Sequence, residues 1–196
     1  MMKKILTVVL AGAMMLLGTS AFAQYSAAGG FSSLSLSGAD AKNWDFSMPG
    51  FYAGVNYDVA FSNLEGLTFE PGVYFAHYGK TFGNTTFTER AYHANYLIVP
   101  VNIKYGTEAS SDFKIAGYTG PRFNLGVGGN AFDKARLGFK NFDAQWGFGI
   151  VFTYADAVQL RAGYDLGLTK AIKNNDWGSD LKIRRNDFHI GIGFLF

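Results

Sequence analysis

Residues 188–196, FHIGIGFLF, carry the alternating pattern that decides the fold. Side chains of an extended strand point to opposite faces in turn, so one face of this stretch holds only large apolar residues. That face consists of Phe188, Ile190, Ile192, Phe194 and Phe196. Chain ends are usually polar and poorly ordered unless something holds them. A terminal strand this apolar therefore needs either a buried place or a non-aqueous surrounding.

Seven earlier stretches show the same alternation of apolar residues with polar residues or glycine, and no stretch sustains a helical spacing. We therefore predict eight strands, at approximately 29–38, 50–61, 66–79, 90–105, 112–126, 142–154, 158–169 and 183–196. The connections alternate in length. The long ones are 39–49, 80–89, 127–141 and 170–182, and the short ones are 62–65, 106–111 and 155–157. An even number of strands with short turns at one end and long loops at the other is typical of outer-membrane barrels.

The size of a barrel interior indicates which face of the strands points outward. An eight-stranded barrel has an interior only just filled by side chains, so the many large apolar residues of one face cannot all fit inside. The other face carries glycine and polar residues, which suit a narrow, tightly curved interior. We therefore predict an all-β fold, an eight-stranded antiparallel up-and-down transmembrane β-barrel with its apolar face in lipid. An ordinary β-sandwich with an aromatic core is the alternative.

The first residues resemble a secretory signal peptide. Lys3 and Lys4 precede an apolar run that ends near Leu17, and Ala21-Phe22-Ala23 provides a cleavage site. The apolar run is shorter than the roughly 20 residues that a membrane-spanning helix needs. We predict a signal peptide at residues 1–23 and a barrel domain at residues 24–196.

The composition excludes several classes of protein. The chain has 25 glycines, 19 phenylalanines and only 16% charged residues, whereas soluble domains average about 25% charged residues. Loss of two lysines with the signal peptide would leave basic and acidic residues in balance, which gives no basis for nucleic-acid binding. The absence of cysteine excludes disulfides, thiolate metal sites and a lipid anchor on cysteine.

Aromatic residues gather at the strand ends, where the two membrane interfaces favour them. On the short-turn side they are Phe61, Phe69, Tyr105, Phe113, Tyr154 and Phe196, and on the long-loop side Trp146 is one of several. We expect these residues to form two girdles around an aliphatic belt.

The inward face contains charged residues that must be paired if they are buried. We predict an interior polar network of Asp58, Glu70, Lys104, Lys114, Arg122, Arg161 and Asp165. Symmetric pairing about the two turns sets Asp58 opposite Glu70 and Lys104 opposite Lys114. Two facing carboxylates would repel each other unless cations lie between them. An acid/base pair formed by these two carboxylates is the competing interpretation to the paired network.

The three histidines lie on three different predicted strands. His77 and His93 flank a long loop and point outward, while His189 points inward. A metal site needs ligands that converge, so we predict no metal, no cofactor and no catalytic histidine.

Several ordered motifs resemble a family of small outer-membrane β-barrel domain proteins of Gram-negative bacteria, sometimes called PorT-like. They include FEPGVYFAHYGK (69–80), NYLIVPVNIKY (95–105), KIAGYTGPR (114–122), WGFGIVFTY (146–154) and LRAGYDLGL (160–168), together with the terminal strand. The resemblance implies export and insertion by the outer-membrane assembly machinery, which would read the apolar face of residues 188–196. Ile98 stands where the family usually has an acidic residue.

These observations predict a monomeric outer-membrane protein of a Gram-negative bacterium that is not an enzyme and acts in surface interaction or envelope integrity. The lysine-rich loop 170–182 is a candidate contact for anionic lipopolysaccharide. An accessory role in protein secretion, which the resemblance implies, and a lipid-modifying enzyme are the alternatives.

Overall fold

The computed structural model describes residues 23–41, 46–61, 63–82, 90–133, 137–173 and 182–196. The predicted signal peptide lies outside these residues, apart from its last residue, Ala23. Within the described part of the chain, no helix has both the length and the apolar character needed to cross a membrane.

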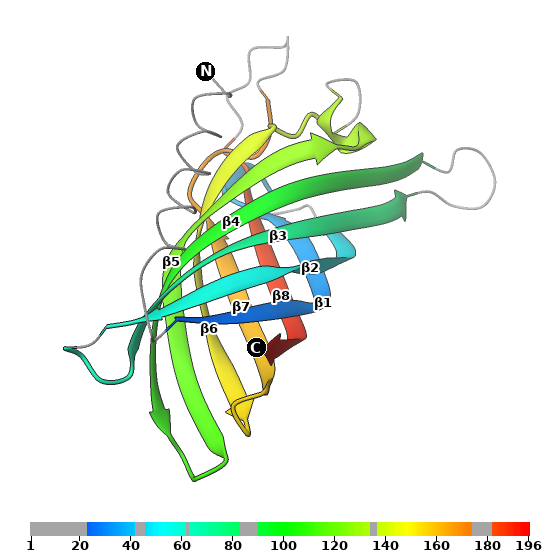
Figure 1. Ribbon diagram of the computed structural model, residues 1–196. Coiled ribbons are helices and arrows are strands. Elements are labelled where there is room, and N and C mark those ends of the chain that lie inside the picture. The colour runs from blue at the N-terminus through cyan, green and yellow to red at the C-terminus, as the bar shows by residue number, and fades with distance from the viewer. Residues whose placement is uncertain (1–22, 42–45, 62, 83–89, 134–136, 174–181) are drawn as a thin grey trace.

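Eight antiparallel strands form a closed barrel in which every strand pairs with its neighbours in sequence (Figure 1). The strands are β1 (Ala23–Ser37), β2 (Ser47–Ala60), β3 (Leu67–Phe82), β4 (Arg90–Glu108), β5 (Phe113–Gly128), β6 (Phe142–Tyr154), β7 (Val158–Gly167) and β8 (Arg184–Leu195). Two short 3-10 helices, η1 (Ala39–Ala41) and η2 (Asn130–Phe132), lie in long loops. The predicted fold is confirmed. The predicted start of the first strand was six residues too late, because small residues at 26–30 hide the alternation.

The terminal strand closes the barrel against β1. The register pairs Ser33 with Phe188 and Phe31 with Ile190, and it continues to Ser26 opposite Leu195. The backbone of Phe196 adds two hydrogen bonds to Tyr25, at 3.2 and 2.9 Å. The predicted pairing of these two segments is confirmed, and closure removes the unpaired edges that an open sheet would expose in lipid.

The connections have the predicted asymmetry, with the long loops at one end of the barrel and the short turns at the other. The shortest turn joins β6 to β7 through residues 155–157, and the φ angles of Ala155 and Asp156 are 50° and 51°. Two successive residues with positive φ are found in type I′ turns, and the Ala157 N–H donates to the Tyr154 carbonyl at 3.0 Å. In outer-membrane barrels the short turns lie at the periplasmic end.

The outer face of the barrel is apolar, as predicted. Of the seven predicted interface aromatics, Phe69 is partly covered and the other six are exposed, with side chains between 43% and 73% accessible. Aliphatic residues between the two ends, such as Ile150 and Leu160, are also exposed on this face. Such a surface would be unfavourable in water and is suited to a lipid bilayer.

The interior differs from the prediction in its long-loop half. The prediction of a polar interior is correct near the short turns and in the middle, but an apolar core fills the barrel mouth at the other end. Its main members are Leu34, Met48, Tyr78, Tyr96 and Ile98 from strands and Phe132, Phe139, Ile172 and Ile183 from long loops. The loop residues enter the barrel because short bridges join segment 137–141 to segment 170–173. Strand alternation alone could not predict this packing.

Candidate functional site

The charged interior begins with Glu70, whose side chain is fully buried. Arg161 binds the carboxylate in a bidentate manner, with Nη2 at 2.6 Å from Oε1 and Nη1 at 2.9 Å from Oε2. Lys104 Nζ donates to Oε2 at 3.2 Å, and Asn102 Nδ2 donates to Oε1 at 3.0 Å. Lys104 and Asn102 come from β4 and Arg161 comes from β7, so Glu70 joins β3 to both strands across the interior.

Lys104 also relieves the repulsion expected between two carboxylates. The pairs Asn56–Gly72 and Val59–Phe69 place Asp58 level with Glu70 on adjacent strands. Lys104 Nζ forms an ion pair with Asp58 as well as with Glu70. The geometry is that of a paired structural network, with each carboxylate matched to a cation.

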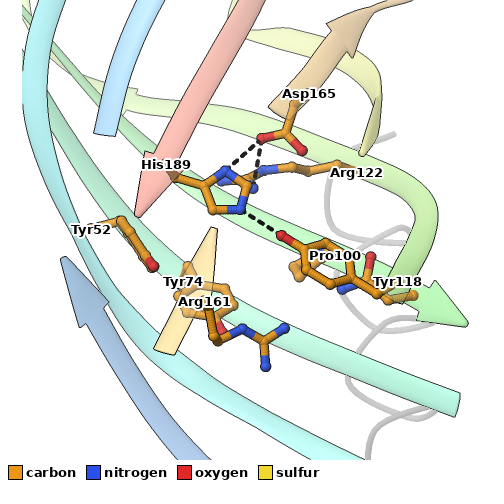
Figure 2. A pocket seen from close by; sticks show the side chains of 9 residues that line it. Tyr52, Tyr74, Pro100, Tyr118, Arg122, Arg161, Asp165 and His189 are labelled. Carbon is orange, nitrogen blue, oxygen red and sulfur yellow. Dashed lines mark hydrogen bonds and ion pairs between the residues drawn. The ribbon is translucent and has the colours of Figure 1, made fainter. Parts of the chain in front are cut away.

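A second group lies nearer the long loops and surrounds Asp165 (Figure 2). Arg122 Nη1 is 2.8 Å from Asp165 Oδ2, and His189 Nδ1 is 3.2 Å from the same oxygen. His189 Nε2 lies 2.9 Å from the Tyr118 hydroxyl. The residues of this group come from β5, β7 and β8, so they cross-link distant parts of the wall.

The cavity beside this group is small. The volume that the centre of a water-sized sphere can occupy in it is about 20 Å³. Its lining includes Tyr52, Tyr74 and Arg161 (Figure 2). One buried water needs roughly 10–15 Å³ on this measure. The Asp165–His189–Tyr118 arrangement therefore has room for water but not for a substrate.

Sequence reasoning missed a third ion group in the long-loop half. Arg185 is almost fully buried and binds Asp143 through Nη1 at 3.0 Å, and its Nε donates to Asp187 at 3.0 Å. Its guanidinium also lies 3.9 Å from the ring centroid of Tyr96 and 5.5 Å from that of Tyr78. The sequence contained a signal for this group. Arg185 and Asp187 are spaced by two residues from each other and from His189, so they lie on the same inward face of the strand.

Lys114 does not belong to the interior network, so this part of the prediction is wrong. Its side chain is 41% exposed and pairs with Asp156 at 2.8 Å and with Glu108 at 3.5 Å. The predicted pair of Lys104 with Lys114 is also wrong, because β4 continues to Glu108 and sets that residue opposite Lys114. The oppositely charged Glu108 and Lys114 therefore face each other near the turn, whereas Lys104 and Lys114 do not.

We expect Lys114→Met to change the free energy of unfolding by less than about 1 kcal/mol, because exposed ion pairs contribute little. Lys104→Met should cost several times more, since it leaves Asp58 without its cation and Glu70 with one fewer. Urea titration of both variants in lipid vesicles would measure the difference. Equal losses would show that the two lysines occupy similar environments, contrary to the structure.

Glycines on the inner wall make room for these large side chains. A Cβ atom built on Gly163 would lie 2.1 Å from the Tyr118 hydroxyl oxygen, and one built on Gly149 would lie 2.4 Å from it. A Cβ atom on Gly191 would lie 2.5 Å from the Tyr52 hydroxyl. The glycine-rich face thus exists because tyrosines and charged residues occupy the same narrow space.

The described residues contain no cluster of three or more side chains suited to a metal ion. His77 lies in the half of β3 nearer the long loops, and its Nδ1 atom is 2.7 Å from Asn95 Oδ1 on β4. His93 is exposed near the long-loop rim. His77 and His93 lie near each other on the outer face of adjacent strands, because His77 pairs with Asn95 and Gly79 pairs with His93. His189 lies apart from both, buried in the interior.

A closed eight-stranded barrel with an apolar outer face and a buried ion network defines an outer-membrane β-barrel protein of the Gram-negative type. The chain belongs to the family described as outer membrane protein beta-barrel domain, which matches residues 19–173. No curated protein matches the chain in sequence.

Solved structures that are similar to this chain are distant in sequence. The outer membrane enzyme PagL is 11% identical with a TM-score of 0.53, and the match covers 87% of this chain and 97% of PagL. Ail, the attachment invasion locus protein of Yersinia pestis, is 12% identical with a TM-score of 0.48 over 89% and 99% of the two chains. OprG from Pseudomonas aeruginosa is 15% identical with a TM-score of 0.47 over 89% and 96%. Such likeness concerns the fold alone.

Proposed function

We propose that this protein is a non-enzymatic, non-conducting outer-membrane barrel that acts in surface interaction or envelope integrity. It is exported by the signal peptide at residues 1–23, which is cleaved, and it works as a monomer. The observation that carries the proposal is the filled interior, which combines three ion groups with an apolar core at the outer mouth.

The filling supports a barrel without a water-filled path. Moving from the short turns toward the long loops, a permeating ion would meet the Glu70–Arg161 pair, then the Asp165 group, then Arg185, which lies over two tyrosine rings. Beyond these it would meet apolar side chains that include Phe132 and Phe139. Each ion pair would have to open, and opening leaves buried charges without partners.

We expect the folded protein to produce no discrete conductance steps in planar lipid bilayers. Folding of the same sample should be checked by the faster electrophoretic migration of unheated barrels. The double variant Glu70→Gly/Arg161→Gly, which removes both side chains of the central pair, is the matched comparison. Steps from the wild-type protein that scale with its concentration would overturn the non-conducting barrel.

The outer loops are the proposed contact for anionic lipopolysaccharide. Lys182 is exposed in the last of these loops, and Arg184 is exposed at the start of β8. Lys173 has a structural contact, because its Nζ donates to the carbonyl of Phe132 at 2.7 Å. Replacing Lys173 and Lys182 with glutamine should weaken lipopolysaccharide association, and unchanged association would remove this contact from the proposal.

The resemblance to PorT-like proteins supports a second candidate, an accessory component of a protein secretion or assembly system. A deletion strain distinguishes the two. Loss of secreted proteins with an intact permeability barrier would favour the secretion role, whereas increased permeability with normal secretion would favour envelope integrity.

The lipid-modifying alternative can be tested directly, and the likeness to PagL does not carry it beyond the fold. Mass spectrometry of lipids from cells that express the protein should show no mass shift if the barrel is non-enzymatic. A shift that disappears on deletion would replace the proposal with an enzyme.

A further inference from the structure

The short-turn end of the barrel contains a chamber of about 810 Å³. Its walls are the β2–β3 and β6–β7 turns and the adjoining strand ends, and the β4–β5 hairpin extends beyond the end of β8 at this side (Figure 1). Its floor includes Lys104 and Asp58, where the buried network begins. Ligand pockets commonly measure about 300–1,000 Å³, so this chamber has the size of a small-molecule site while the interior beyond it does not.

The charges that line the chamber are unbalanced. Four carboxylates face it, from Asp58, Glu65, Glu108 and Asp156, against the ammonium groups of Lys104 and Lys114. Both ammonium groups already form ion pairs with carboxylates. Lys104 also pairs with Glu70, which is fully buried and does not line the chamber. The chamber therefore has a net negative charge that low-dielectric walls would focus.

One oxygen of the floor lacks a partner. Asp58 Oδ1 is buried and accepts no hydrogen bond from any described residue, although Lys104 binds the other oxygen. Burying such an acceptor without a donor is unfavourable. An additional donor that reaches the chamber floor would satisfy it.

The rest of the wall is mixed. Its apolar part consists of Leu64, Leu67, Ile115 and Leu195, together with Phe61 and Tyr105 of the short-turn girdle, and uncharged polar residues such as Thr68 and Gln159 supply the remainder. A ligand that matches both features combines a positively charged amino group with an aliphatic chain. Water-exposed anions and neutral sugars would satisfy neither the charge nor the apolar walls.

We propose that the chamber binds an alkylammonium ligand from the periplasmic side, with its amino group toward Asp58 and its methylene chain along the apolar wall. This inference goes beyond the proposed function and does not depend on it. Two sources offer this chemistry, a free aliphatic polyamine and a lysine side chain of a short peptide.

The test uses calorimetric titration of the folded barrel in detergent micelles, with spermidine and trilysine as probes and triglutamate as the charge-reversed control. We expect saturable binding of spermidine, of trilysine or of both, with no binding of triglutamate. Binding of spermidine alone identifies a free polyamine, and binding of trilysine alone identifies a peptide. Binding of neither probe overturns the proposal.

The double variant Glu65→Gln/Asp156→Asn should weaken binding by about tenfold or more, because it removes two of the four carboxylates. Both positions are exposed, and asparagine tolerates the positive φ of residue 156, so the variant should fold. The control variant is Asp112→Asn, which removes a carboxylate at the same end but outside the chamber lining. Equal weakening in both variants would indicate general surface attraction and would overturn a chamber site.

Discussion

Replacing Glu70 with leucine is expected to destabilise the barrel by about 3–5 kcal/mol, the usual cost of removing one partner from a buried ion pair. The change would leave the Arg161 guanidinium without its bidentate acceptor and would reduce Lys104 to a single carboxylate partner. Leucine fills a similar volume, so loss of the charge and not a cavity would dominate the effect.

The measurement is the free energy of unfolding from urea titration in lipid vesicles. Glu108→Gln is the control, because its side chain is 73% exposed and an exposed pair contributes at most about 1 kcal/mol. The double variant Glu70→Leu/Arg161→Leu should recover part of the lost stability, since it removes the uncompensated cation. A loss below about 1 kcal/mol for Glu70→Leu would show that the interior network does not hold the barrel together.

Replacing Gly30 with alanine should have the second large effect, because this residue lies at the seam that closes the barrel. A Cβ atom there would lie 2.1 Å from the Ile190 carbonyl oxygen and 2.4 Å from Gly191 Cα. These are backbone atoms of β8, which cannot move away without disturbing the β1–β8 hydrogen bonds. We expect a loss on the order of 3 kcal/mol, at the upper end for overpacking, and a smaller folded fraction on electrophoresis.

Gly117→Ala is the matched control, also a glycine in a barrel strand. A Cβ atom at Gly117 would meet only the carbonyl oxygen of Gly149, at 3.9 Å. Its effect should stay within about 0.5 kcal/mol. If the two alanine variants were equally stable, the close approach of β1 and β8 would not limit closure.

The interior site could be predicted from the sequence only in part. Asp58, Glu70, Arg122, Arg161 and Asp165 point inward because strand alternation fixes their side. Lys114 shares that phase, yet it lies beyond the point where the barrel encloses its residues. Its partners are Glu108 at the end of β4 and Asp156 in a turn. Alternation determines a face of the sheet but not the depth of a residue along the barrel axis.

The sequence by itself determined the eight strands, their antiparallel order, the apolar outer face and the closing role of residues 188–196. These features depend on local periodicity and on the length of connections, which are properties of short segments. The tertiary structure alone decided which charges pair, that loop residues such as Phe132 and Ile172 plug the outer mouth, and that a chamber remains open at the opposite end. Those features depend on the register between strands and on contacts across the barrel, which bring together side chains distant in sequence.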